Sequence, residues 1–195
     1  MSTSRQAAIP AIETSPGIWG MWLLVLTEAA LFGALLLSYI YERSNADIWP
    51  PAGVEPPKLL LPLIMTVLLL GSSVTMLGAE RAIRTGRVNR MKLALAASVA
   101  LAAGFLGLQA YEYSRETMSL GDSVYSSLFF TITGLHGLHV AIAVLMGAWL
   151  VLRAVLGHFS RDRHLAIRVV SLYWHFVDVV WIAILGVLYF LPHVW

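Results

Sequence analysis

Apolar residues fill five long stretches of the chain, and polar residues gather in the short segments between them. A membrane-spanning helix needs about 20 mainly apolar residues, and each of the five stretches meets that requirement. The sequence therefore predicts an all-α fold, a polytopic membrane bundle of five transmembrane helices. The predicted spans are residues 18–41, 59–79, 93–111, 124–152 and 169–191.

The segments around these spans suggest how they connect. The fourth span is too long for an upright helix, so we expect it to tilt, to kink near Gly134 and Gly137, or to extend past the bilayer. The Pro-rich connector "NADIWPPAGVEPPK" ends the first helix and precedes the second. No linker is long enough for a second domain. We therefore predict a tail at 1–17 and a single five-helix domain at 18–195.

Two patterns of small residues predict close helix packing, because small side chains let helix backbones approach each other. One pattern joins Ala29 to Gly33 in the first span, and the other joins Ala103 to Gly107 in the third. Such patterns are common in membrane proteins, so they indicate packing and carry little information about function.

The distribution of Lys and Arg predicts the orientation, because cytoplasmic loops hold the excess of these residues. Three of the 13 lie on one side of the predicted bundle, namely Arg43, Lys58 and Arg115. The others lie on the opposite side: Arg5, Arg81, Arg84, Arg87, Arg90, Lys92, Arg153, Arg161, Arg163 and Arg168. The N-terminus is therefore predicted to be cytoplasmic and the C-terminus to lie outside. No small-residue cleavage site follows the polar start, so we expect the first helix to be retained as an anchor.

Composition agrees with a membrane protein and excludes several classes of site. Hydrophobic residues make up 58% of the chain and charged residues 12%, against about 25% charged in soluble domains, and the mean hydropathy is +0.76. The pI near 9.1 does not indicate a nucleic-acid binder, because the few basic residues are placed as orientation signals. The absence of cysteine excludes disulfides, thiolate metal sites and a thiol nucleophile.

Five ionisable residues lie inside the predicted spans, where they are costly and point to function. They are Glu28, His136, His139, His175 and Asp178. We expect them to form one buried polar cluster near the bilayer midplane if the first, fourth and fifth helices are neighbours. Such a cluster has three interpretations: a metal site, a route for protons or oxygen, or a set of hydrogen bonds that holds helices together.

The metal interpretation rests on His136 and His139, which share a helix face at a spacing of three, with His175 and a carboxylate as further ligands. The sequence has no zinc motif, and histidines three apart cannot ligate opposite faces of one haem. We therefore favour hydrogen bonding between helices and expect this chain to bind no metal.

The sequence leaves the roles of the two carboxylates, Glu28 and Asp178, undecided. Burial favours a neutral Glu28 unless a charged partner is close, which suits either a protonatable site on a pathway or a hydrogen bond to a facing helix. His175 and Asp178 lie on one face, as do Trp174 and Asp178, so each pair could bond within the bundle. A catalytic dyad would need a nucleophile, and no G-x-S-x-G motif is present. We expect no catalytic residue in this chain.

A set of motifs in fixed order resembles a known family. These are "WPP" (49–51), "LQAYEY" (108–113), "VYSSLFF" (124–130), "HGLHV" (136–140) and "YWHFVDVVW" (173–181). Together they resemble subunit III of the haem–copper oxidases, most closely the cytochrome c oxidase members, over nearly the whole chain from about residue 20.

The resemblance implies an all-helical, noncatalytic subunit of a redox-driven, proton-translocating oxidoreductase. Such a subunit binds neither haem nor copper and packs beside the catalytic subunit I, and we expect subunit II nearby. Glu28 matches a buried glutamate associated with oxygen entry and protection during turnover. Arg153 matches a basic position associated with a phospholipid head group. The expected location is the inner or plasma membrane, with several crossings.

The chain departs from the family pattern in two ways. The long form has seven spans and this chain is predicted to have five, so its lipid cleft loses the helices that normally bound it. Leu135 also replaces the Phe that often precedes "HGLHV". Related accessory subunits of a nitric oxide reductase or a quinol oxidase remain as alternatives. An independent proton-coupled transporter, using Glu28 and Asp178, lacks the broken helices or inverted repeat of that class.

Overall fold

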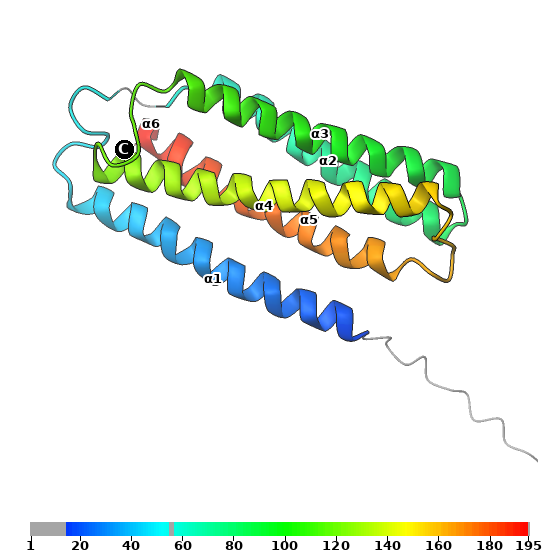
Figure 1. The fold of residues 1–195 in the computed structure, drawn as a ribbon. Coiled ribbons are helices and arrows are strands. Elements are labelled where there is room, and N and C mark those ends of the chain that lie inside the picture. The colour runs from blue at the N-terminus through cyan, green and yellow to red at the C-terminus, as the bar shows by residue number, and fades with distance from the viewer. Residues whose placement is uncertain (1–14, 55–56, 195) are drawn as a thin grey trace, which may run out of the picture.

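Five long helices account for most of the computed structural model, which describes residues 15–54 and 57–194 (Figure 1). Each is long and apolar enough to cross a membrane, and the described residues contain no strand, so the predicted five-span helical fold is confirmed. The long helices are α1 (Pro16–Asn45), α2 (Leu60–Arg84), α3 (Val88–Arg115), α4 (Val124–Val155) and α5 (Leu165–Ile184). A π-helix, η1 (Leu185–Phe190), and a final turn, α6 (Leu191–Val194), continue α5.

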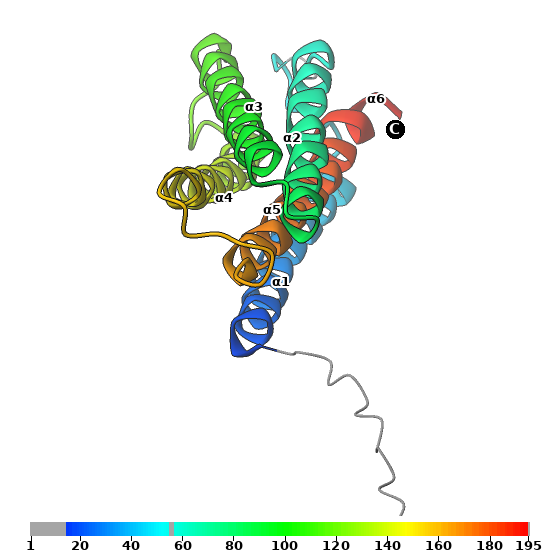
Figure 2. The same ribbon diagram turned by 90° about the vertical axis from the view of Figure 1, so that its right-hand side faces the viewer.

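The helices pack around α5. Seen along the bundle, α5 lies between α1, α2 and α4, whereas α3 lies on the far side from α1 (Figure 2). A short turn joins α2 to α3, and this pair forms the most extensive contact in the fold. The main contacts of α1 are with α4 and α5, so the first helix lies at the edge of the bundle. The first, fourth and fifth helices are therefore neighbours, as the polar-cluster prediction required.

Local sequence signals set the helix ends. Pro16 begins α1, where its missing N–H leaves no bond unmade. Ser123 caps α4 through a reciprocal capping box with Ser126. Gly86 and Gly157 follow α2 and α4 with φ of 72° and 76°. This left-handed conformation is common after a helix and is readily adopted by glycine, so both helices end where a glycine is available.

The Pro-rich connector is tied to the bundle by its tryptophan. The indole N–H of Trp49 donates to the hydroxyl of Tyr39 in α1 at 3.0 Å. Its ring also packs edge-on against Tyr39 and against Tyr125 at the start of α4, with 5.3 Å between centroids in each case. The first residue of the "WPP" motif therefore links the end of α1 to the beginning of α4.

The helix α4 runs unbroken through Gly134 and Gly137 for 32 residues. At 1.5 Å per residue its length is roughly 48 Å, well beyond a hydrocarbon core of about 30 Å. The helix shows no break at these glycines. Whether its extra length is taken up by tilt, by a kink near them or by extension past the bilayer stays a prediction.

The predicted small-residue contacts are wrong at two glycines. A Cβ added to Gly33 or Gly107 would meet no atom within 4 Å, so neither glycine marks a close helix approach. Tight sites occur instead in α4. A Cβ on Gly147 would lie 2.8 Å from Val99 and 2.9 Å from Trp174, and one on Gly137 would lie 2.6 Å from Gln109. The close approaches thus join α4 to α3 and α5.

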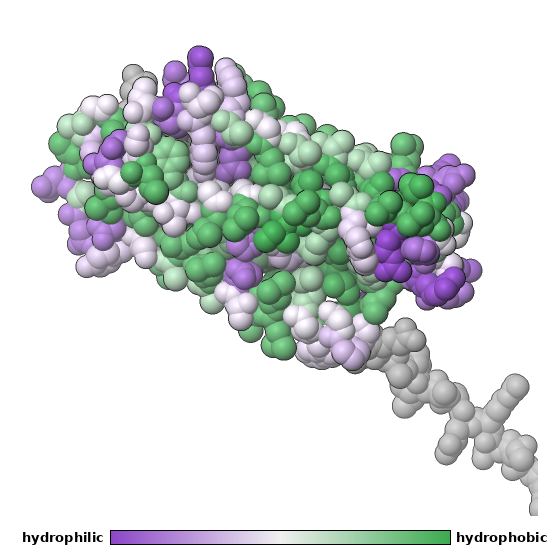
Figure 3. Space-filling view, viewed as in Figure 1, coloured by the Kyte–Doolittle hydropathy of each residue, from purple (hydrophilic) through white to green (hydrophobic). Residues whose placement is uncertain are grey.

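The surface is banded, as expected for a multi-pass membrane protein. Hydrophobic residues cover the middle of the visible face, and hydrophilic residues gather toward its ends (Figure 3). Which end faces the cytoplasm remains a prediction from the Lys and Arg count, as does the division into a tail and one domain. Most of the tail, including Arg5, lies outside the described residues.

Candidate functional site

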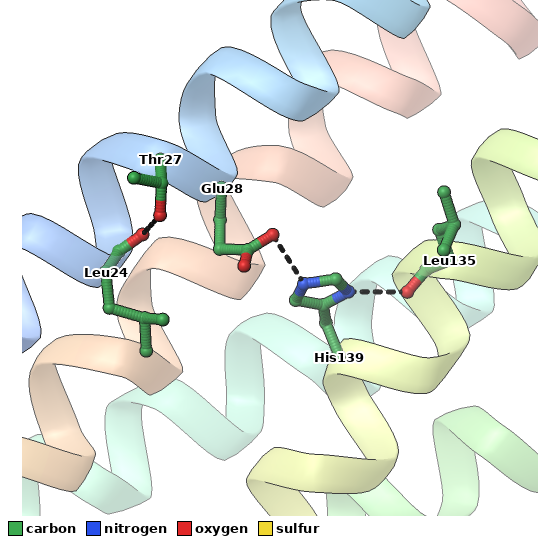
Figure 4. Close-up of polar contacts among 5 residues, drawn as sticks. All are labelled: Leu24, Thr27, Glu28, Leu135 and His139. Atoms are coloured by element: carbon green, nitrogen blue, oxygen red, sulfur yellow. Dashed lines mark hydrogen bonds and ion pairs between the residues drawn. The ribbon is translucent and has the colours of Figure 1, made fainter.

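Glu28 and His139 form the most direct polar contact between α1 and α4. Nε2 of His139 lies 3.1 Å from Oε2 of Glu28, and its Nδ1 lies 2.7 Å from the carbonyl oxygen of Leu135 (Figure 4). A carbonyl oxygen can only accept, so Nδ1 must carry a proton. The Nε2–Oε2 contact then shares one further proton. The pair is either a neutral imidazole with a carboxylic acid or an imidazolium with a carboxylate.

Aromatic rings enclose the imidazole of this pair. Phe32 of α1 packs edge-on at 5.1 Å between centroids, and Tyr173 of α5 lies nearly parallel at 6.5 Å. The His139 side chain is 10% exposed and that of Glu28 is 24% exposed. Three helices therefore meet at a polar pair that is screened from one side by rings and partly open on the side of Glu28.

His136 lies one turn before His139 but has different surroundings. It is fully buried, its ring is nearly parallel to that of Trp181 at 5.2 Å, and Phe105 and Phe32 pack edge-on against it. Among the described residues, neither ring nitrogen has a hydrogen-bond partner. Its contacts reach α1, α3 and α5, so His136 is part of an aromatic core.

His175 and Asp178 of α5 meet through Ser73 of α2. The Ser73 hydroxyl donates to Oδ2 of Asp178 and lies 2.8 Å from Nδ1 of His175. A hydroxyl has one proton to donate. Because Ser73 donates this proton to Asp178, its oxygen must accept from the Nδ1–H of His175. Nε2 of a neutral imidazole then accepts from Ser171 at 3.2 Å. The donors are therefore Ser171, His175 and Ser73 in that order, and Asp178 is the final acceptor.

The five predicted site residues therefore occupy three places. Glu28 and His139 bond directly, His175 and Asp178 share Ser73, and His136 lies among rings. The predicted bond between the Trp174 indole and Asp178 does not form. The Trp174 indole donates to Ser72 at 2.9 Å instead, because the α2 hydroxyls lie closer to that face of α5.

The hydroxyl residues of α2 were missed by sequence reasoning. Besides Ser72 and Ser73, Thr66 accepts from the indole of Trp181 at 2.9 Å. Thr66 and Ser73 are seven residues apart, which places them on one face of a helix. A search for Ser and Thr at that spacing inside an apolar run would have indicated that this face of α2 meets a polar partner.

Arg153, predicted to meet a lipid head group, lies over two aromatic rings near the end of α4. Its guanidinium carbon is 4.8 Å from the ring centroid of Trp149 and 5.4 Å from that of Phe159. Cation–π contacts of this kind hold a guanidinium in place. The lipid role of Arg153 stays a prediction.

The described part of the chain has no group of three or more His, Asp or Glu side chains that could hold a metal ion. His139 and His175 use both ring nitrogens in hydrogen bonds within the bundle. The ring neighbours of His136 are Phe and Trp side chains, which do not bind haem iron or copper. These donor sets do not fit a haem or a copper centre.

Fold and site together define a multi-pass membrane bundle whose ionisable groups pair across helices. The family model for cytochrome c oxidase subunit III matches residues 11–193. The chain belongs to the cytochrome c oxidase subunit III family.

Individual relatives agree with this assignment. Cytochrome c oxidase subunit 3 of Synechocystis sp. is 35% identical over 89% of this chain and 75% of its own length. The protein of the same name from Thermostichus vulcanus is 34% identical over 89% of the chain and 87% of its length. Cytochrome c oxidase subunit 3 of Pisaster ochraceus is 38% identical over 91% of this chain and 72% of its own length. The similarity therefore spans nearly all of this chain.

Proposed function

We propose that this chain is a noncatalytic subunit of a cytochrome c oxidase in aerobic electron transport. The observation that carries the proposal is the family match over residues 11–193. The hydrogen-bonded histidines support it, because their ring nitrogens are engaged within the bundle. In this proposal the haem and copper belong to the partner subunits, and this chain binds none. The complex lies in the inner or plasma membrane.

The proposed partners are the catalytic subunit I, subunit II and membrane lipids, with a phospholipid near Arg153. Large apolar side chains of α1 support a partner or lipid at its outer face, since Trp22, Leu23 and Leu26 are all more than half exposed. The Glu28–His139 pair lies beneath this edge helix. Within the proposal, the pair holds α1 in position and keeps a proton at the edge of the bundle, which stabilises the catalytic subunit through repeated turnover.

The test is the composition of the native complex purified by a tag on this chain. We expect a large subunit with a haem–copper centre to co-purify, together with cytochrome c oxidase activity. A stable five-helix protein that purifies without such a subunit would overturn the proposal. A nitric oxide reductase or quinol oxidase as the co-purifying enzyme would assign the chain to a related complex. The relatives compared above, all named as cytochrome c oxidase subunits, favour the first outcome.

A further inference from the structure

A cavity of about 790 Å³ opens between the start of α2 and the end of α3. Its lining includes Lys58, Leu60, Ile64, Glu112, Arg115 and Glu116. This is the end of the bundle that also carries the α1–α2 and α3–α4 connections (Figure 1). It is opposite the end at which α4 places Arg153, so it is separate from the lipid position predicted there.

Charges of both signs line this cavity. Lys58 and Arg115 are exposed, and the guanidinium of Arg115 lies 5.8 Å from the ring centroid of Tyr111. Within the described residues neither cation forms an ion pair. Glu112 is 7% exposed and accepts from the hydroxyl of Tyr189 at 3.2 Å. The wall therefore offers two cations and a buried carboxylate to one ligand.

Glu116 adds a second carboxylate, one turn beyond Glu112 on the same face of the chain. Burial raises the pKa of Glu116, and the neighbouring Lys58 lowers it, with burial the larger effect. A carboxylate held partly away from water gains more from a cationic partner than a fully hydrated one does. Lys58 supplies part of this stabilisation, and a ligand with an ammonium group would add to it.

An apolar stripe leads from the cavity along the surface of α2. Leu60, Ile64 and Val67 follow one helix face at spacings of four and three residues, and they are 73%, 45% and 72% exposed. On the neighbouring α3, Gly107 lies one turn before Tyr111 and has no atom within 4 Å of an added Cβ. This side of the α2–α3 pair can therefore accept a hydrocarbon chain without displacing a side chain.

We propose that the cavity binds the head group of a zwitterionic phospholipid with a primary ammonium, as in phosphatidylethanolamine. Lys58 and Arg115 would bind the phosphate, Glu112 and Glu116 would accept from the ammonium, and an acyl chain would lie along the α2 stripe. Charge complementarity selects this ligand, because the carboxylates oppose a purely anionic head group. A trimethylammonium has no N–H to donate, so a choline head group would leave both carboxylates without a hydrogen bond.

The test measures lipid retention by the full complex in nanodiscs, using native mass spectrometry. Phosphatidylethanolamine, phosphatidylcholine and phosphatidylglycerol with identical acyl chains compete in equal amounts. We expect the ethanolamine lipid to be retained roughly tenfold over the others, the effect of one charge-assisted hydrogen bond. The double variant Lys58→Gln/Arg115→Gln should lose this retention, and Glu116→Gln should reduce the preference over phosphatidylglycerol.

The matched control is Arg90→Gln/Lys92→Gln, which removes two positive charges at the other end of α3 and should leave retention unchanged. Equal retention of the three lipids by the wild-type complex would overturn the proposal. Competition by soluble glycerophosphoethanolamine as strong as by the lipid would also overturn it, since the site would then bind a soluble phosphate ester. The wild-type competition decides the question even if a variant fails to assemble, and co-purification of the catalytic subunit is scored separately.

Discussion

The helices α1 and α5 are both apolar enough to cross a membrane, but the bundle holds them in different ways. In the most apolar stretch of α5 with its continuation, 50% of the residues are buried, against 17% for α1. The first helix therefore exposes most of its surface to lipid or to another subunit, whereas α5 forms the centre of the fold. Similar hydropathy does not imply a similar degree of packing.

The polar contacts of the two helices differ in number and in kind. Four side chains of α5, namely Trp174, His175, Asp178 and Trp181, bond to hydroxyls of α2. By contrast, α1 is tied to α4 by the Glu28–His139 pair, in which both side chains are ionisable. The fifth helix is thus fixed by several neutral donors, and the first by a pair that shares a proton. A substitution at the α5 contacts should therefore change the free energy of unfolding. A substitution at Glu28 should change the proton sharing with His139.

The largest effect is expected from a methyl group added at the tight contact of α5. Gly147→Ala would place its Cβ 2.8 Å from Val99 and 2.9 Å from the Trp174 ring. Overpacking of this kind costs about 1–3 kcal/mol, so the free energy of unfolding should fall by that amount. Unfolding by SDS in mixed detergent micelles, followed by tryptophan fluorescence, measures the change.

The matched control in α1 is Gly33→Ala, because a Cβ at Gly33 meets no atom within 4 Å. We expect its free energy of unfolding to equal or exceed that of the wild type, since Ala favours a helix over Gly. Equal losses from the two substitutions would show that α1 is packed as tightly as α5 and would remove the basis of the comparison.

A smaller effect is expected from the hydrogen bond between Ser73 and Asp178. Bonds between membrane helices contribute about 0.6 kcal/mol on average and up to about 1.7 kcal/mol. In a double-mutant cycle of Ser73→Ala and Asp178→Ala, each of which removes the bond, we expect a coupling energy near the upper value, because both residues are buried and His175 shares the same hydroxyl. The same unfolding assay gives the four free energies that the cycle requires.

The control cycle combines Ser73→Ala with Glu28→Gln. These residues lie in separate contacts, one between α2 and α5 and the other between α1 and α4. Independent sites add to within about 0.3–0.5 kcal/mol. A larger coupling would mean that the five ionisable residues act as the single cluster predicted from sequence, and the division into three places would have to be abandoned.

The spans were predictable because length and hydropathy alone determine whether a segment can cross a bilayer. That Glu28 lies near a helix-four histidine could also be expected from the sequence, since a buried charge needs a partner. The link between His175 and Asp178 through Ser73 could not be predicted. Serine is a small hydroxyl residue that occurs in many membrane helices, and its own sequence context in "GSSVT" does not say which helix it faces.

The contacts of Gly33 and Gly147 could not be predicted for a related reason. In a soluble helix, polar residues mark the outer face, but a membrane helix is apolar both toward lipid and toward its neighbours. The sequence thus does not distinguish Gly33, which meets no atom, from Gly147, which lies against Val99 and Trp174. The π-helix η1 at Leu185–Phe190 likewise could not be predicted, because its sequence is a run of apolar residues like the rest of the span.

The smallest structural effect, and the one that tests the chemical side of the comparison, is expected from Glu28→Gln. With Nδ1 of His139 bonded to the Leu135 carbonyl, Nε2 of the neutral imidazole can accept from the glutamine amide. The contact is then kept, but its proton can no longer move between the two side chains. If the chain serves an oxidase as proposed, initial oxygen reduction should be close to wild type and activity should be lost at a different rate over many turnovers.

Oxygen consumption by the purified complex, recorded from the first turnovers until activity stops, measures both quantities. Glu42→Gln is the control, because it removes a carboxylate from the far end of the same helix and leaves His139 with its partner. We expect its inactivation rate to match the wild type. Immediate loss of all activity in Glu28→Gln with the complex still assembled would contradict the prediction, since Glu28 would then be required for each turnover. An unchanged inactivation rate would mean that the pair only holds α1 in place, as the neutral contacts hold α5.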